Sequence, residues 1–237
     1  GNPYDESSLK PAAHPNARFT VPAGQCPIID PFFLNPEGVP ISAILFGGRR
    51  AQLIPLVMES FDWNHGVFLG ARMGSETTAA AIGQVGVIRR DPMAMLPFCG
   101  YNMGDYFDHW FNVGKKLTNP PKVFSVNWFR TDENATFMWP GFGDNIRVLK
   151  WMIDRINNKV DAKETPTGLV PNIADMDLSG TNVSRENMEK LLDVNVADWQ
   201  GEVADIKAYL EQFGEHMPQA MWDEYDKLEN AVSHVVC

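Results

Sequence analysis

The chain has 237 residues, which suits one large domain or one domain with an appended helical bundle. Hydrophobic residues make up 44% of it and charged residues 21%, so we expect a packed core, and no apolar run is long enough to cross a bilayer. The formal net charge is −10, and residues 184–237 hold 12 acidic and 4 basic side chains. This composition argues against nucleic-acid binding, but the nearly neutral remainder permits an anion site.

The three cysteines, Cys26, Cys99 and Cys237, have irregular spacing. They fit neither a disulfide framework nor a zinc site, so we expect a reducing, cytoplasmic compartment. No secretory signal opens the chain, and it begins at Gly1 rather than Met, which suggests a piece of a longer protein.

Apolar runs and turn residues predict four β-strands, at residues 41–46, 67–70, 85–88 and 122–128. A helix is expected at 104–113. A second helix should begin near Asn145, capped by Asp144 or Asn145, because apolar residues then recur at spacings of three and four. Residues 165–181 read as a Pro- and Gly-punctuated connector.

Two or three further helices are expected after this connector. Two apolar stripes within them are read as core packing, and the acidic residues between them as a solvated face. The stripes are Trp199, Val203, Ile206, Leu210 and Phe213, then Met221, Tyr225, Leu228 and Val232. The predicted fold class is therefore α+β: a mixed β-sheet with packed helices in residues 1–171, and an acidic helical tail in 172–237 packed on the same lobe.

Four segments carry residue types suited to anion or base binding. The first is Gly47-Gly48-Arg49-Arg50 at a predicted strand end, where glycines permit a close backbone approach and arginines present donors to phosphate oxygens. The second is Asn16-Ala17-Arg18, in which Asn and Arg share one face of an extended chain. Taken singly, each is more simply read as a solvated surface feature.

The third segment, residues 128–145, places aromatic residues with Gly and Pro between a strand and a helix. Flat rings can sandwich a planar base and an Asn can read its edge, although a hydrophobic loop folded on the core is an equal reading. The fourth, residues 72–86, is small, Gly-punctuated and nearly free of bulky side chains, which suits a lid or a short alanine helix.

Other chemistry is not indicated. The chain has no Gly-x-x-x-x-Gly-Lys-Ser/Thr phosphate loop. Its histidines show no metal-ligand spacing and are read as structural. They are His14, His65, His109, His216 and His234. A phosphoryl-transfer site lacking both a metal and a phosphate cradle would be incomplete.

The four segments occur together and in a fixed order, and in this order the sequence resembles the C-terminal part of GTP-dependent phosphoenolpyruvate carboxykinase. The similarity runs from about His14 to about Pro171. It includes Cys-Pro-Ile-Ile-Asp at 26–30, Pro-Glu-Gly-Val-Pro at 36–40, Phe-Gly-Gly-Arg-Arg at 46–50, Asp-Pro-Met-Ala-Met at 91–95, Gly-Tyr-Asn at 100–102 and residues 127–145. Residues after Pro171 match weakly.

The resemblance implies interconversion of oxaloacetate and GTP with phosphoenolpyruvate, GDP and CO2, in gluconeogenesis. Asn16, Ala17 and Arg18 would hold the substrate carboxylate and the transferring phosphoryl group. Arg18 and Arg49 would be catalytic and contact the nucleotide phosphates, with Arg50 supporting Arg49. Guanine would be sandwiched by Phe129 and Phe142 beside Phe137, its edge meeting Gly143, Asp144 and Asn145. The implied lid comprises Ser75, Glu76, Thr77, Thr78, Ala79, Ala80, Ala81, Gly83 and Gly86.

The resemblance also implies what this chain lacks. The family's phosphate loop with its reactive cysteine, its manganese or magnesium ligands and a further substrate arginine precede the matched region. We therefore expect no metal ligand here, dependence on a missing N-terminal part of the same enzyme, and no activity of the isolated chain. Two other readings stay open: a structural fragment without nucleotide binding, and the same chemistry with ATP or pyrophosphate.

Overall fold

The computed structural model describes residues 5, 7, 9, 20–78 and 85–233, in two compact units. The smaller unit comprises Gly1–Pro40 and Thr77–Val87, and the larger comprises Ile41–Glu76 and Ile88–Cys237. In the smaller unit, a 3-10 helix spans Ala23–Gln25. The Thr77 N–H donates to the Val87 carbonyl at 2.9 Å, which brings the two ends of the segment 77–87 together.

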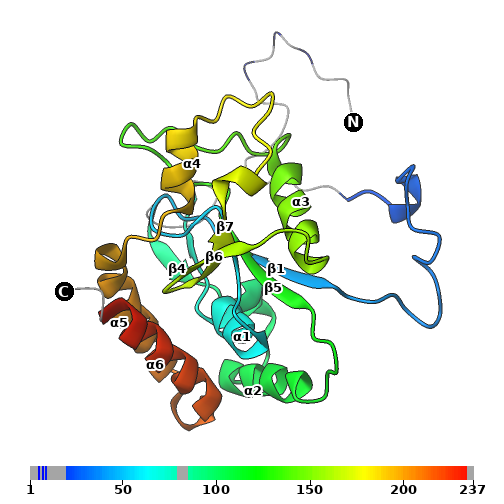
Figure 1. Cartoon of the computed structure of the whole chain (residues 1–237). Helices are drawn as coiled ribbons and strands as arrows, with labels where there is room; N and C mark the ends of the chain where they lie inside the picture. The colour runs from blue at the N-terminus through cyan, green and yellow to red at the C-terminus, as the bar shows by residue number, and fades with distance from the viewer. Residues whose placement is uncertain (1–4, 6, 8, 10–19, 79–84, 234–237) are drawn as a thin grey trace. The chain divides into compact units, whose positions relative to one another are not determined.

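The larger unit is built on a five-stranded mixed sheet with strand order β1-β5-β2-β7-β6 (Figure 1). Strands β1 and β5 are parallel, and the other neighbours are antiparallel. The strands are β1 (Ala43–Gly47), β2 (Val57–Glu59), β5 (Lys122–Val126), β6 (Ala162–Thr165) and β7 (Gly168–Pro171). A separate hairpin pairs β3 (Gly74–Glu76) with β4 (Ile88–Arg90). The α+β class with a mixed sheet is thus confirmed.

Six helices lie in the described part of the larger unit: α1 (Trp63–Ala71), α2 (Met103–Gly114), α3 (Asn145–Ile156), α4 (Arg185–Leu192), α5 (Val196–Glu211) and α6 (Gln219–Ser233). Short 3-10 helices span Pro92–Ala94, Leu96–Phe98, Ile173–Asp175 and Gly214–His216. Three helices therefore follow the connector, as predicted.

The sheet separates two hydrophobic cores. Along β5, Val123 packs with α1, α2, α5 and α6, whereas its neighbours Phe124 and Val126 pack with α3 and α4. This alternation follows from the two-residue period of a strand, and a sheet covered on both faces has two apolar surfaces to bury. Both predicted tail stripes are confirmed as core, with Phe213 at its margin.

The predicted strand at residues 67–70 is wrong, because these residues lie in α1. The helix is buried on nearly all sides from His65 to Ala71, so it shows no polar face, and a short apolar run reads equally as a strand. Its beginning is marked by Asp62, whose carboxylate accepts the His65 N–H at 2.8 Å.

Other boundaries also differ from the prediction. Strand β4 begins at Ile88, where the predicted strand 85–88 ends, and the connector at 165–181 contains β7. The short strand β2 was missed because three buried residues carry no readable period. Asp144 occupies the N-cap of α3, but its carboxylate accepts from Arg147 Nε rather than from a capping N–H.

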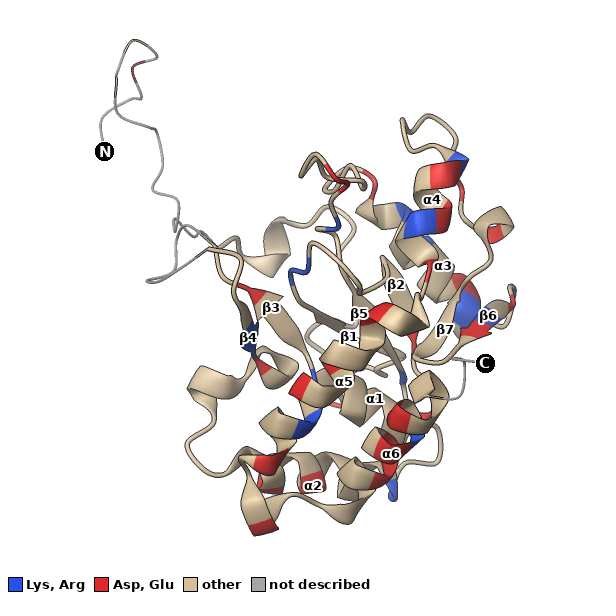
Figure 2. Ribbon diagram, turned by 90° about the vertical axis from the view of Figure 1, so that its left-hand side faces the viewer, with Lys and Arg blue, Asp and Glu red and all other residues tan. Residues whose placement is uncertain are grey.

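The acidic tail is only partly a solvated face. Asp and Glu residues recur along α4, α5 and α6 (Figure 2). Two of these carboxylates, Glu202 and Glu224, are nevertheless buried. Glu224 is bound by Lys227 at 2.6 Å, and burial raises the pKa of its carboxyl group.

Glycine at position 66 is required by the close approach of α1 to the sheet. A β-carbon there would lie 2.5 Å from Val123 Cγ2 and 2.6 Å from its Cβ. We expect Gly66→Ala to lower the free energy of unfolding by about 1–3 kcal/mol, because β5 is paired with a strand on each side and cannot yield. Chemical denaturation measures the change.

Gly201 provides the matched control, since it also lies within a helix but a β-carbon there meets nothing within 4 Å. Gly201→Ala should raise stability by about 0.5–1 kcal/mol through helix propensity. Equal effects of the two substitutions would contradict the packing assigned to α1.

Candidate functional site

The turn Gly47-Gly48-Arg49-Arg50 lies where β1 ends, as predicted. A β-carbon on Gly48 would lie 2.4 Å from the Gly74 carbonyl oxygen, so only glycine permits this approach of two backbones. The turn is thereby brought against the β3–β4 hairpin. Its two arginines then diverge, with Arg50 buried and Arg49 half-buried.

Arg49 is held on both sides of its backbone by β3. Its N–H donates to Ser75 Oγ at 3.1 Å, and its carbonyl accepts from the Glu76 N–H at 2.7 Å. The Glu76 carboxylate in turn accepts the Ala51 N–H at 2.8 Å. The Arg49 guanidinium lies over the Phe129 ring, 4.3 Å from its centroid, which places a cation and an aromatic face together.

Asn127 joins the turn to the aromatic loop. Its buried side-chain carbonyl accepts from the backbone N–H groups of Arg50 and Phe129, each at 3.2 Å. Its amide donates to the carbonyls of Arg50 and Ile54 at 2.8 and 3.0 Å. One side chain therefore fixes the positions from which Arg49 and Phe129 project. The sequence reading did not assign it this role.

The aromatic loop is brought together only in part. Phe129 and Phe137 form an edge-to-face pair with centroids 6.0 Å apart, which Phe142, at 99% exposure, does not join. Asn145 accepts from Trp139 Nε1 at 2.8 Å, leaving its amide N–H groups available. One carboxylate oxygen of Asp144 accepts a hydrogen bond from Arg147 Nε at 2.8 Å. Gly143 is exposed.

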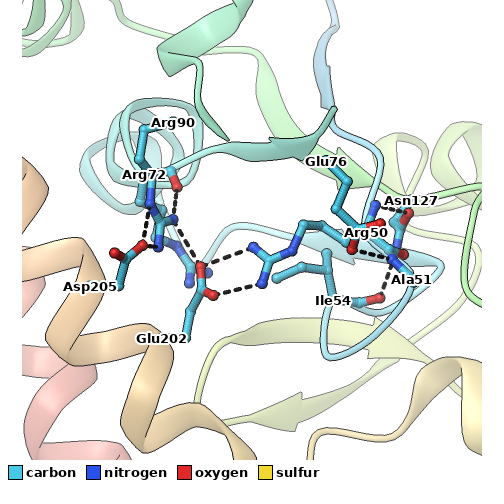
Figure 3. A network of polar contacts seen from close by, with 9 residues as sticks. All are labelled: Arg50, Ala51, Ile54, Arg72, Glu76, Arg90, Asn127, Glu202 and Asp205. Carbon is cyan, nitrogen blue, oxygen red and sulfur yellow. Dashed lines mark hydrogen bonds and ion pairs between the residues drawn. The ribbon is translucent and has the colours of Figure 1, made fainter. Parts of the chain in front are cut away.

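Arg50, which the resemblance gives as a support for Arg49, is itself bound inside the protein. It forms two parallel hydrogen bonds with Glu202 of α5, at 3.0 and 2.6 Å (Figure 3). Both side chains are about 6% exposed. A two-point contact of this kind with a buried carboxylate orients the guanidinium away from solvent.

The same carboxylate binds a second arginine at the base of the hairpin. Arg90, at the end of β4, donates to Glu202 at 2.8 Å and to the Arg72 carbonyl at 2.7 Å, and it also pairs with Asp205 (Figure 3). Burial acts to raise the pKa of Glu202, but Arg50 and Arg90 together lower it to about 2. Glu202 is therefore ionised throughout the neutral range.

Glu202 was missed because the acidic tail reads as a solvated face. The spacing of the apolar residues in α5 does indicate that Glu202 is buried. Glu202 lies three residues after Trp199 and directly before Val203, on the buried stripe of α5. A carboxylate on such a stripe requires a cationic partner, which the sequence does not identify.

The remaining predicted site residues fall in different parts of the chain. Ser75 and Glu76 form β3, whereas Thr77, Thr78 and Gly86 belong to the smaller unit. The predicted lid residues Ala79, Ala80, Ala81 and Gly83 lie outside the described residues, as do Asn16, Ala17 and Arg18.

Within residues 20–78 and 85–233, no group of three or more His, Cys, Asp or Glu side chains is placed to hold a metal ion. Over the same residues, the helices are too short or too polar to span a membrane. His65 is buried and accepts the Phe61 N–H at Nδ1; burial, then the charges of Arg72 and Lys227, lower its pKa to about 3. It is thus neutral and structural.

The family model described as the phosphoenolpyruvate carboxykinase C-terminal P-loop domain matches residues 1–231. The chain is similar to the phosphoenolpyruvate carboxykinase [GTP] of Anaeromyxobacter dehalogenans, at 50% identity over 93% of the chain and 37% of the relative. The proteins of the same name from Chlamydia abortus and Chlamydia caviae are 51% and 49% identical over 97% of the chain and 38% of the relative. The chain thus spans under two-fifths of the length of these relatives.

Removing the charge of Glu202 should destabilise the protein, because Arg50 and Arg90 would lose their common buried partner. We expect Glu202→Gln to lower the free energy of unfolding by about 3–5 kcal/mol at pH 7. The carboxyl pKa is lowered on folding, so its contribution is complete above its ordinary value and is lost as pH falls toward about 2.

Denaturant titrations of both proteins between pH 7 and pH 2.5 should therefore show the difference shrinking below about pH 4.5. The control is Glu211→Gln, which removes an exposed carboxylate from the same helix and should change stability by no more than about 0.5 kcal/mol. A difference that stays constant with pH would exclude the ion-pair role.

Proposed function

Because this chain belongs to the phosphoenolpyruvate carboxykinase family, we propose that it forms the guanine-nucleotide part of an enzyme that interconverts oxaloacetate and GTP with phosphoenolpyruvate, GDP and CO2. The chain matches only 37–38% of its relatives' length, so the complete reaction belongs to the longer polypeptide. We propose that this reaction serves gluconeogenesis and takes place in the cytoplasm.

The observation that carries the proposal is the position of Arg49 over Phe129. A nucleotide has an aromatic base and an anionic phosphate chain. Phe129 offers an aromatic ring to the base, and the Arg49 guanidinium, 4.3 Å from the centroid of that ring, offers donors to the phosphates. Ser75 and Glu76 hold the Arg49 backbone, and Asn127 holds the start of the aromatic loop. These contacts fix both side chains near strand ends, which supports the proposal.

We assign guanine to the space beside Phe129 and Phe137, with Phe142 as the second ring of the sandwich. The exposure of Phe142 supports this assignment, because a fully exposed aromatic ring gains contact area when a base stacks on it. The Asn145 amide offers donors to the guanine carbonyl oxygen. Asp144 offers an acceptor to the ring N–H and amino group, and Gly143 leaves the backbone accessible.

On the substrate side, we propose that Asn16 and Arg18, with Ala17 between them, hold the substrate carboxylate and the transferring phosphoryl group. The segment from Ser75 to Gly86 would act as a lid that excludes water. The phosphate loop and the ligands for Mn2+ or Mg2+ would come from the remaining part of the same enzyme. That metal, when bound, supplies positive charge for the phosphate oxygens.

Two alternatives to a guanine-nucleotide site predict different binding. An isolated structural fragment would bind no nucleotide, since the proposed phosphate cradle is absent. An enzyme of the same type that used ATP or pyrophosphate would not discriminate in favour of guanine.

Titration of the chain with GDP and with ADP, followed by tryptophan fluorescence, tests the base assignment. We expect quenching by GDP in preference to ADP. Phe129→Ala should weaken GDP binding about tenfold or more through lost stacking, and Arg49→Met should weaken it through lost phosphate contact. Phe98→Ala, which removes a ring that is 76% exposed elsewhere, should leave the affinity unchanged.

No response to either nucleotide would favour the structural fragment. Equal responses would remove the guanine assignment. Thermal unfolding of each variant separates weakened binding from lost folding.

We expect the reaction to require both this chain and the remaining part of the longer polypeptide. The chain alone, supplied with oxaloacetate, GTP and Mn2+, should form no phosphoenolpyruvate, whereas the complete polypeptide that carries it should. Coupled detection of phosphoenolpyruvate measures both, and product formation by the purified chain would overturn this division.

A further inference from the structure

Arg72 is a buried cation at the end of α1, outside the nucleotide site. The residue is only 5% exposed. Its guanidinium lies between two aromatic rings, 5.3 Å from the Phe68 centroid and 4.9 Å from that of Trp199. The rings favour the positive charge but accept no conventional hydrogen bond from the guanidinium edge.

The hydrogen-bonding capacity of Arg72 is unused within the described part of the chain. Its Nε has no partner, and its side chain forms no ion pair. The nearby carboxylate of Glu202 accepts two hydrogen bonds from Arg50 and one from Arg90, and it forms none with Arg72. A buried N–H donor without an acceptor is costly, so we expect Arg72 Nε to take an acceptor that is not a protein side chain.

The local charge count selects an anion over water. Three arginines, Arg50, Arg72 and Arg90, face two carboxylates, Glu202 and Asp205, which leaves one positive charge in excess. Burial, with the neighbouring Arg90 and Arg50 and against Glu202, lowers the pKa of Arg72 to about 9, so it remains charged at neutral pH. Water would satisfy the donors but would not neutralise the excess charge.

A cavity of about 30 Å³ adjoins this guanidinium. Its polar lining residues are Arg50, Arg72, Ser125 and Glu202, and most of the others are apolar, including Met58, Leu69 and Val126. The volume suffices for one small ion or one to two waters. Apolar walls favour a weakly hydrated monatomic anion over a strongly hydrated one.

We propose that this cavity binds one halide ion, chloride under ordinary conditions, with Arg72 as its principal ligand. The ion would complete the polar network that joins α5 to the turn at Arg50 and to the base of the β3–β4 hairpin at Arg90. Its binding depends only on the folded larger unit and not on the proposed nucleotide chemistry. The two proposals can therefore fail separately.

Thermal unfolding of the chain is measured while sodium chloride replaces sodium gluconate at constant ionic strength, so that general screening is unchanged. A ligand that binds the folded state raises the midpoint in a saturating manner. We expect a rise of about 3–5 °C when chloride exceeds its dissociation constant about tenfold. Bromide should act similarly.

Arg72→Met retains a long apolar side chain against Phe68 and Trp199 but removes the charge, so its midpoint should not respond to chloride. Arg89→Met, which removes an exposed arginine from β4, should respond as the parent does. A flat parent curve, or parallel rises in the parent and in Arg72→Met, would overturn the proposal.

A second measurement uses only the parent protein, so it does not depend on whether Arg72→Met folds. Crystals of the parent soaked in bromide should give an anomalous difference peak beside the Arg72 guanidinium. Water alone in that position, with no anomalous signal, would overturn the proposal as well.

Discussion

The paired hydrogen bonds of Glu202 to Arg50 and Arg90 are the constraint on which the described site depends. They connect three segments far apart in the chain: helix α5, the turn after β1 and the end of the β3–β4 hairpin. A buried ion pair is not by itself evidence of net stability, because desolvation of both groups opposes their attraction. Its strong consequence is geometric. Any arrangement that separated these segments would leave a buried charge without a partner, which is far less favourable than the paired state.

The two adjacent arginines of the turn are thereby given different environments. Consecutive side chains on extended backbone point to opposite sides, so Arg50 enters the core when Arg49 faces the aromatic loop. Asn127 stabilises this division by bonding the Arg50 backbone in both directions and the Phe129 N–H once. In the structure, one arginine of the turn lies over the ring of Phe129 and the other is bonded to the buried Glu202.

Patterns with a clear period were predictable from sequence. Helices α2 and α3 and the tail stripes show apolar spacing of three and four, and β1 and β5 are apolar runs bounded by turns. Helix α1 was misread because nearly every residue in it is buried, and β2 because three residues carry no period. The turn and the aromatic loop were found through residue type. Glu202, Arg72 and Arg90 were not, because their roles arise from contacts across 18 to 152 positions.

The acidic tail does not conflict with the proposed anion-binding site, because most of its carboxylates are exposed. Exposed carboxylates on α4 to α6 act through water and salt, and their influence decays over about 8–10 Å at physiological ionic strength. Glu202 acts through the protein interior at contact distance, where it neutralises Arg50, whereas Arg49 lies over the Phe129 ring. The formal net charge counts every charged residue of the chain, whereas burial decides which of these charges face the solvent. In this chain, one carboxylate from the acidic segment orients Arg50, one of the two arginines in the turn after β1.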